Sequence, residues 1–271
     1  MAARHTANDD FDPAAARASL QLVRATVARY FRLEARGMQN IPRGRCMVVG
    51  CHSGVVPYDA ACTLVAIEEH TGRLARAVGD ELFGRLKFVE SYLRQRGAIV
   101  GKRDEAAAIV RQGNILLVFP GGAADMTRPI WRDAYRVLPH KGFAPGRGGY
   151  VKIALATRTP IVPLAVVGAE EAHMMLGDVS PVAWLLGTPF FPALAFWFPL
   201  PVKLYVRFGT PIRFQEHPAA ADDQAVVDRL NERVRRSVQA LIDDTLRRRN
   251  GVIWSSYDDR PKATPHRRRK R

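Results

Sequence analysis

The chain of 271 residues can form one large domain or two small ones, and its hydrophobic content of 47% is ample for a sizeable core. A globular protein is therefore expected. The formal net charge of +15 means that anionic surfaces attract the chain, whether they are nucleic-acid phosphates or the headgroups of a membrane leaflet. Charge alone does not choose between these two partners.

The cysteine content indicates a reducing compartment. Cys46, Cys51 and Cys62 are odd in number, and no apolar signal stretch is seen at the N-terminus, so we expect free thiols, a cytosolic setting and no secretion. The three residues lack the C-x-x-C spacing of a structural zinc site, and no metal is expected.

The first predicted element is a basic amphipathic helix over residues 13–32. Its apolar positions recur at helical spacing, at Leu20, Val23, Val27 and Phe31. Such a helix can lie on a membrane or simply pack on the domain. We assign residues 1–31 to this helical region, 32–250 to the main domain and 251–271 to a basic, disordered tail that ends in HRRRKR.

The main domain alternates predicted strands and helices. Short runs rich in Val, Ile or Leu predict buried strands at residues 47–51, 115–119 and 161–167. Helical patterns lie at residues 60–70, 80–96 and 103–112, the last with Gly113 as its C-cap. This alternation predicts an α/β fold with a largely parallel sheet covered by helices.

Two further elements follow. Residues 202–208 alternate apolar Leu204 and Val206 with polar neighbours, which is typical of an edge strand or a half-exposed strand. A long charged helix is expected at about residues 222–249.

The most apolar segment runs from Pro181 to Pro201 and has no charged residue, so its length could cross a bilayer. Its internal prolines argue against a spanning helix, because each removes a backbone donor. We predict a broken, partly buried hairpin whose aromatic residues face a core or a lipid interface: Trp184, Phe190, Phe191, Trp197 and Phe198. An ordinary core segment is the alternative.

The first candidate site begins where the strand at residues 47–51 ends, at His52. Functional groups of α/β sheets gather at the carboxyl ends of strands. Pro57 suits a first helical position, which would place Asp59 in the first turn of the next helix. A loop that folds back through Gly54 would bring the Asp59 carboxylate against the imidazole and fix its tautomer. Alternatively, the two residues are unrelated.

The second candidate site, Phe119-Pro120-Gly121-Gly122, also follows a predicted strand. Gly121 and Gly122 would let backbone N–H groups point at an oxyanion or a phosphate. A plain turn would use the same residues.

Residues 50–54, GCHSG, have the outline of a nucleophile elbow, but His52 holds the nucleophile position and Ser53 is out of frame. A serine hydrolase is therefore not indicated. Cys51 points away from His52 if both continue the strand, and it is expected in the core.

Four blocks in order resemble the lysophospholipid and glycerolipid acyltransferase superfamily over residues 32–214. They are His52 with Asp59; Gly97 to Arg103, a Gly-x-x-x-x-x-Arg; FPGGAAD in place of the family's FPEGTR; and a Val-Pro strand. Six residues separate His52 from Asp59 instead of the usual four. The altered third block, HKGFAPGRGG at residues 140–149 and the stretch 198–212 are similar to the mono- and diacylglycerol acyltransferase-like branch.

The resemblance implies that His52 deprotonates an acceptor hydroxyl, that Asp59 orients the imidazole, and that the oxygen attacks a donor thioester directly. It also implies that the N–H groups near Gly121 and Gly122 stabilise the oxyanion and that Arg103 binds a phosphate. Other basic residues could supply cations for substrate: Lys102, Arg128, Arg132 and Lys141.

The expected activity is the transfer of a fatty acyl group from acyl-CoA or acyl carrier protein to a hydroxyl of a glycerolipid or related lipid. Phosphatidic acid formation from lysophosphatidic acid is an alternative. No cofactor or nucleic acid is expected, and the enzyme would be peripheral or monotopic on the cytoplasmic face of an anionic membrane. A catalytically inactive, basic membrane- or nucleic-acid-binding protein is the alternative from another class.

Overall fold

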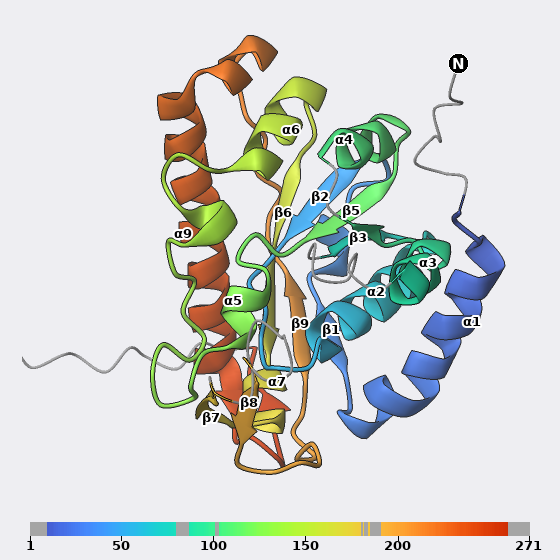
Figure 1. Ribbon diagram of the computed structural model, residues 1–271, viewed down its shortest axis with the longest axis vertical. Coiled ribbons are helices and arrows are strands. Elements are labelled where there is room, and N and C mark those ends of the chain that lie inside the picture. Colours follow the sequence, from blue (N-terminus) through green and yellow to red (C-terminus); the bar gives the residue numbers. More distant parts are fainter. Residues whose placement is uncertain are drawn as a thin grey trace, which may run out of the picture.

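The computed structural model describes residues 10–79, 87–100, 103–179, 181, 184 and 191–259. Its centre is a seven-stranded sheet in the order β1-β9-β6-β2-β5-β3-β4 (Figure 1). The strands are β1 (Glu34–Arg36), β2 (Cys46–Val49), β3 (Arg76–Gly79), β4 (Ile99–Val100), β5 (Ile115–Val118), β6 (Ile161–Val167) and β9 (Tyr205–Phe208). All neighbouring strands are parallel except β6 and β9.

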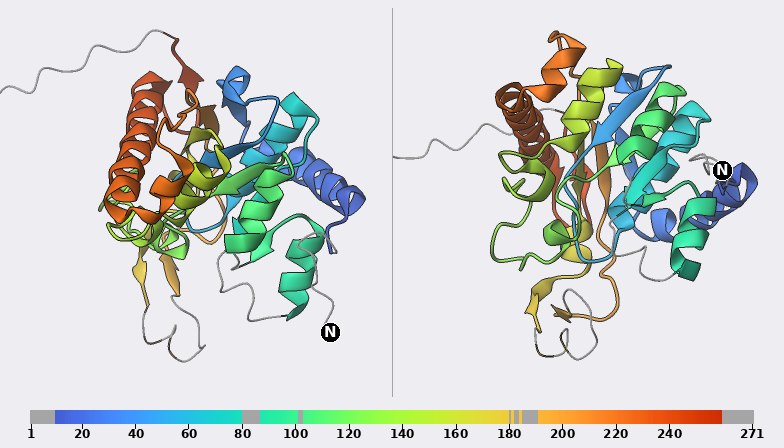
Figure 2. Two further views of the ribbon diagram at one scale, coloured as in Figure 1. Left: turned by 90° about the horizontal axis from the view of Figure 1, so that it is seen from above. Right: turned by 45° about the horizontal axis from the view of Figure 1, so that its top comes forward.

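Helices cover both faces of the sheet (Figures 1 and 2). The long helix α9 (Gln224–Arg248) packs on one face with α4 (Arg103–Arg111) and α6 (Gly149–Thr157). The opposite face is covered by α2 (Tyr58–Thr71) and the N-terminal helix, which consists of α1 (Pro13–Val23) and the π-helical turn Arg24–Ala28. Along β2, Met47 and Val49 enter the first core, and Cys46 and Val48 enter the second. The predicted α/β fold is confirmed.

The strands with continuous apolar runs were predictable, because both faces of the sheet are buried and their residues are all apolar. Gly113 adopts a left-handed φ of 89° after α4, as its predicted C-cap role requires. Of the helix predicted at residues 80–96, the structure has α3 (Lys87–Gln95), and residues 80–86 lie outside the described part. The short strands β3 and β4 were not predicted.

The edge-strand prediction for residues 202–208 is wrong. Strand β9 lies inside the sheet, because β1 pairs with its outer side. Tyr205 is only 1% exposed. The polar positions that suggested an edge form ion pairs instead: Lys203 with Glu34, and Arg207 with Asp244 on α9. The charged residues alternate with apolar ones because their charges are paired, and the strand is not exposed.

The N-terminal helix packs on the domain. Arg17 forms an ion pair of 2.7 Å with Glu68 on α2, and Phe31 is 1% exposed. Leu22 and Tyr30 remain exposed on the outer side. The helix therefore packs on the domain, as one of the two interpretations predicted. Its exposed apolar residues, Leu22 and Tyr30, could contact a membrane as well.

The apolar segment forms part of a two-stranded antiparallel hairpin, β7 (Met175–Asp178) with β8 (Pro192–Leu194), at the bottom of Figure 1. Trp184, Trp197 and Phe198 are 84%, 74% and 85% exposed, so the alternative of an ordinary core segment is wrong for them. Phe190 and the tail from residue 260 lie outside the described residues. Within the described part, no helix is both long enough and apolar enough to cross a membrane.

Candidate active site

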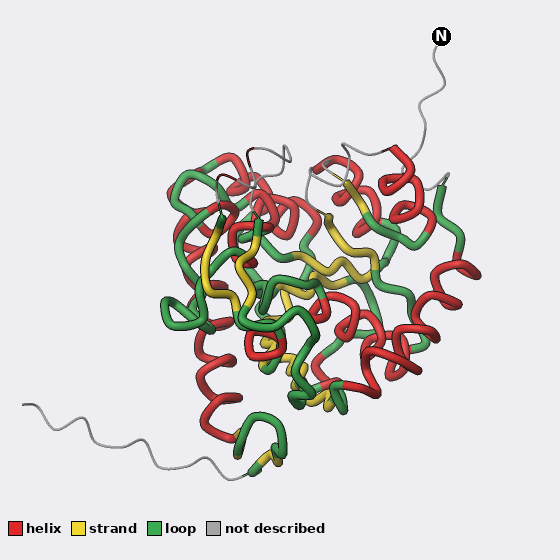
Figure 3. The backbone as a smooth tube through the Cα atoms, turned by 60° about the horizontal axis from the view of Figure 1, so that its bottom comes forward, coloured by secondary structure: helices red, strands yellow, loops and turns green. Residues whose placement is uncertain are grey.

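The site lies at the carboxyl end of β2, the end turned forward in Figure 3, where loops surround the ends of the strands. Three residues after β2, the chain reaches His52 and turns sharply at Gly54, whose φ is 84°. A side chain at Gly54 would place its Cβ 2.4 Å from the carbonyl oxygen of Ala169. Glycine therefore permits the turn that carries the chain back to α2.

His52 and Asp59 are in direct contact. Nδ1 of His52 lies 2.8 Å from Oδ2 of Asp59, and the same oxygen accepts the N–H of Ser53 at 2.8 Å. Asp59 is fully buried, in the first turn of α2, while the His52 side chain is 13% exposed. The predicted fold-back is confirmed, and the interpretation of two unrelated residues is wrong. A carboxylate on Nδ1 keeps the proton there and makes Nε2 the basic nitrogen.

The second candidate segment packs on this pair. The ring of Phe119 stacks on the His52 imidazole, with 4.0 Å between ring centroids and an interplanar angle of 18°. Because Phe119 follows β5, the neighbour of β2 in the sheet, two strand ends define one site.

The two glycines act in different ways. A Cβ at Gly121 would lie 2.0 Å from Oδ2 of Asp125, so Gly121 makes room for a carboxylate. The N–H of Gly122 donates to the carbonyl of Phe119 at 3.0 Å and closes a turn. The turn interpretation therefore describes Gly122 in this structure. Its predicted oxyanion role stays a prediction and would need that hydrogen bond to open.

Arg103 and Lys141, the predicted substrate cations, are not part of the His52–Asp59 pair. Arg103 is exposed at the start of α4, and its side chain lies against Gly149. Lys141 is exposed in a short turn with a φ of 49°. Lys102 lies outside the described residues.

Arg128 is not the substrate cation that its charge suggested. Its side chain is only 9% exposed and points inward, where Nη2 donates to the carbonyl of His52 at 3.1 Å. It also lies 3.7 Å from Glu170. Arg132, by contrast, is 80% exposed.

The sequence interpretation also missed a second His–Asp contact. Nε2 of His140 lies 2.7 Å from Oδ1 of Asp125, whose other oxygen accepts the N–H of His52 at 3.3 Å. The signal lay in the two segments that resemble the diacylglycerol acyltransferase-like branch, because one holds Asp125 and the other begins at His140.

Burial governs the electrostatics of the site. It raises the pKa of Glu170 to about 7, against the lowering effect of Arg128, and the carboxylates of Asp125 and Asp59 raise it further. Burial also raises the pKa of the Cys51 thiol well above its usual range, with Asp125 contributing in the same direction. Cys51 is therefore an uncharged thiol at neutral pH and a poor nucleophile. In the described part of the chain, no group of three or more His, Cys, Asp or Glu residues could hold a metal ion.

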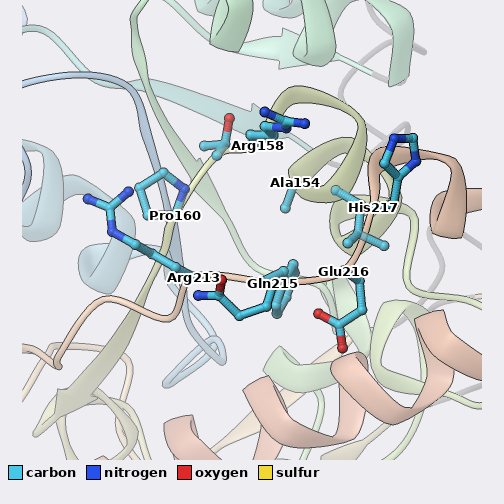
Figure 4. Close-up of a pocket in the computed structure, with 10 residues that line it drawn as sticks. Ala154, Arg158, Pro160, Arg213, Gln215, Glu216 and His217 are labelled. Atoms are coloured by element: carbon cyan, nitrogen blue, oxygen red, sulfur yellow. The ribbon is translucent and has the colours of Figure 1, made fainter.

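A cavity of about 410 Å³ lies elsewhere, beside Pro160, Arg158, Arg213 and His217 (Figure 4). Pro160 precedes β6, whereas His52 follows the parallel strand β2. The cavity is thus at the amino end of these strands, opposite to the His52 site.

Comparisons with known proteins identify the family of the chain. The acyltransferase family model matches residues 32–167. An uncharacterised protein of Mycobacterium tuberculosis is 32% identical over 245 residues, which are 86% of this chain and 67% of that protein. The mouse "DGAT1/2-independent enzyme synthesizing storage lipids" is 27% identical over 227 residues, 84% of this chain and 64% of the enzyme.

The 1-acyl-sn-glycerophosphate acyltransferase PlsC of Thermotoga maritima is similar in structure, with a TM-score of 0.49, 19% identity and coverage of 81% of this chain and 80% of that one. The chain belongs to the acyltransferase family, because the family model matches half of it. It spans about two thirds of the length of the mycobacterial and mouse relatives.

Proposed function

We propose that this acyltransferase moves a fatty acyl group from acyl-CoA to a hydroxyl of a glycerolipid, with His52 as general base. The observation that carries this proposal is the 2.8 Å contact between His52 and the fully buried Asp59 at the carboxyl end of β2. A buried carboxylate fixes the imidazole and stabilises the cation that forms when it accepts a proton. Acyl carrier protein is the alternative donor.

The reaction needs no protein nucleophile. Nε2 of His52 takes the proton of the acceptor hydroxyl as its oxygen bonds to the thioester carbonyl carbon. The tetrahedral oxyanion then collapses, the carbon–sulfur bond breaks, and the leaving thiolate takes the proton from His52. The neighbouring Cys51 is a buried, uncharged thiol, which supports direct transfer over a covalent acyl-enzyme.

The charges around His52 favour an uncharged acceptor. The carboxylate of Asp59 contacts the imidazole, that of Asp125 accepts the N–H of His52, and the buried Arg128 directs its charge at protein groups. A phosphate on the acceptor would be repelled by the carboxylates of Asp59 and Asp125. The name of the mouse relative, which refers to storage lipids, agrees with a neutral acceptor such as mono- or diacylglycerol. Lysophosphatidic acid is the alternative, with Arg103 and Lys141 as its exposed cations.

We also propose that the enzyme binds peripherally to the cytoplasmic face of an anionic membrane. An exposed aromatic face supports this, and we define it as Tyr30, residues 196–198 and residues 252–254. Its parts are tied together: the Tyr30 hydroxyl donates to the carbonyl of Pro199 at 2.6 Å, and Arg32 donates to the carbonyl of Ile253 at 2.8 Å. Trp254 lies in the segment 251–271, whose basic end, HRRRKR, follows at residues 266–271.

The aromatic face adjoins the active site. A ring nitrogen of His173 lies 3.3 Å from the carbonyl oxygen of Trp197, and its imidazole stacks on Tyr58, which begins α2 next to Asp59. A membrane that contacts Trp197 would therefore deliver a lipid hydroxyl close to His52. Removal of residues 262–271 should weaken binding to anionic liposomes at low salt, since each basic residue near such a surface contributes about 1 kcal/mol. Equal partitioning of the truncated protein would refute a role for the tail.

The decisive test of the function is turnover. Purified protein is incubated with liposomes, labelled acyl-CoA and one acceptor at a time: monoacylglycerol, diacylglycerol, a long-chain alcohol or lysophosphatidic acid. We expect labelled product lipid with a neutral acceptor and none with His52→Ala. Liposome binding without product for any acceptor would favour the inactive binding protein.

A further inference from the structure

The main chain of His52 is held on both sides by one short segment. The N–H of His52 donates to Oδ2 of Asp125 at 3.3 Å, and the carbonyl of His52 accepts from Nη2 of Arg128 at 3.1 Å. Asp125 lies on α5 (Ala123–Met126), directly after the Phe119–Gly122 turn, and Arg128 follows two residues after that helix. The segment that departs from the family's third block therefore contacts the backbone of the residue that we assign as the base.

We propose that Asp125 and Arg128 are positioning residues, which together form a main-chain clamp on His52. Asp59 fixes the imidazole ring, and the clamp fixes the backbone from which the ring projects. In this chain the third block thus serves the base instead of binding a substrate phosphate. The inference rests on the proposed role of His52 in acyl transfer.

Three features fix the position of the Asp125 carboxylate: its burial against Gly121, its contact with His140, and the anchoring of the loop that carries His140. Its side chain is only 1% exposed, and its carboxylate occupies the space that a side chain at Gly121 would need. Its second oxygen is 2.7 Å from Nε2 of His140. The loop that carries His140 is anchored in turn, since the N–H of Gly142 donates to the carbonyl of Pro120 at 2.8 Å. The carboxylate therefore has one available orientation, with Oδ2 toward His52.

Arg128 completes the clamp from the other side. Its Nε donates to the carbonyl of Asp125 at 2.8 Å, and its Nη2 also lies 3.4 Å from the sulfur of Cys51. The charge is offset by Glu170 at 3.7 Å and by the nearby Asp125. Nη1 of Arg128 donates to the carbonyls of Asp133 and Arg136, so every guanidinium nitrogen of this buried arginine has a protein acceptor.

This arrangement matters because general-base catalysis requires hydrogen-bond reach between the base and the acceptor proton. A displacement of about 1 Å can cost on the order of 100-fold in rate. A change in the clamp should therefore lower kcat and leave KM for both substrates nearly unchanged, since Asp125 and Arg128 are engaged with protein groups.

The first experiment measures kcat and KM for Arg128→Met and for the shape-conserving Asp125→Asn, with Arg136→Met as the control. The side chain of Arg136 is 69% exposed on the same loop. We expect kcat to fall about tenfold or more in the first two variants, with KM within about twofold, and no change in the control. Arg128→Lys, which keeps one donor and the charge, should recover part of the loss. A raised KM with unchanged kcat would show that Arg128 binds substrate and would overturn the clamp.

A second experiment uses the closeness of Gly121 to Asp125. A methyl group in Gly121→Ala would collide with the carboxylate and should lower kcat as the clamp variants do. In an Asp125→Gly background, the same substitution should cause no further loss, because the collision is gone. Independent, additive losses would overturn the link between Gly121 and the clamp.

A readout that does not depend on turnover separates the two proposals. The rate at which diethyl pyrocarbonate modifies His52, followed by mass spectrometry, reports the exposure and basicity of its ring. The clamp predicts an altered rate in folded Asp125→Asn and Arg128→Met and the wild-type rate in Arg136→Met. If the wild type has no transferase activity but these rates change, the proposed function fails and the clamp stands. If the wild type is active and the variants match it in both rate and modification, the clamp alone fails.

Discussion

The two ends of the central sheet differ in kind. At the carboxyl end, His52 lies with the buried carboxylates of Asp59, Asp125 and Glu170 and with the buried Arg128, which are joined by hydrogen bonds and ion pairs. At the amino end, a cavity of about 410 Å³ is bordered by the exposed arginines Arg158 and Arg213. This cavity thus lies away from the groups that we propose for proton transfer. The difference teaches that a cavity alone is a poor guide to this molecule, because the organised buried polar groups, with the proposed base among them, lie at the opposite end.

The largest expected effect on the transfer rate comes from a substitution at the carboxyl end of the sheet, compared with one at the amino end. His52→Ala removes the base, and we expect acyl transfer to fall by about 10² to 10⁴, since general-base catalysis is typically worth that much. Arg213→Ala, at the amino-end cavity, should keep the wild-type rate. Transfer rates in the liposome assay, with circular dichroism to confirm folding, check both variants. Near-normal turnover by folded His52→Ala would place the chemistry elsewhere.

A smaller loss is expected when the orientation of the base is weakened. Asp59→Asn keeps a hydrogen-bonding side chain but no longer stabilises the imidazolium, so kcat should fall about tenfold or more. The pH–rate profile of the variant should also change, because the basicity of His52 depends on its partner. An unchanged kcat together with an unchanged profile would remove Asp59 from the mechanism.

A further prediction concerns Arg103, the exposed cation at the start of α4. Its loss in Arg103→Ala should raise KM about tenfold for the substrate whose phosphate it binds, with a smaller effect on kcat. Initial rates at varied acyl-CoA, and then at varied acceptor, identify that substrate. If neither KM changes, the exposed Arg103 only supports α4.

The smallest expected effect is on the pH dependence of the free energy of unfolding, through Glu170. The pKa of Glu170 is about 7 in the folded protein, against an ordinary value of 4.5, so the folded state binds more protons than the unfolded state between these pH values. The free energy of unfolding should therefore fall as pH rises from about 4.5 to 8. Glu170→Gln should lose this dependence, which is on the order of 1 to 3 kcal/mol. Urea denaturation at pH 5 and pH 8 measures it, and equal pH slopes in both proteins would refute the assignment.

Much of the fold could be predicted from the sequence, since β2, β5 and β6 are continuous apolar runs that must be buried on both faces. Strand β3 was missed because its sequence, RAVG, is not a continuous apolar run, and β4 has only two residues. Strand β9 was misassigned because its charged positions form ion pairs. The contact between His52 and Asp59 was predictable, because a glycine turn and a helix start lie between them.

The remaining site residues required the three-dimensional structure. Asp125 and His140 are 15 residues apart and come together only because one loop packs on the Phe119–Gly122 turn. The sequence shows Arg128 as a positive charge among many, and only tertiary packing turns it inward to His52. Irregular segments have no period from which such contacts could be inferred.

The central claim is that the carboxyl end of the sheet activates the acceptor hydroxyl directly, with no acyl-enzyme. The most direct measurement is the intact mass of the protein after it is mixed with a slight deficit of acyl-CoA, first without acceptor and then with it. We predict an unmodified protein mass in both mixtures and acyl lipid only when acceptor is present. A protein heavier by one acyl chain, formed without acceptor and discharged when acceptor is added, would contradict the account.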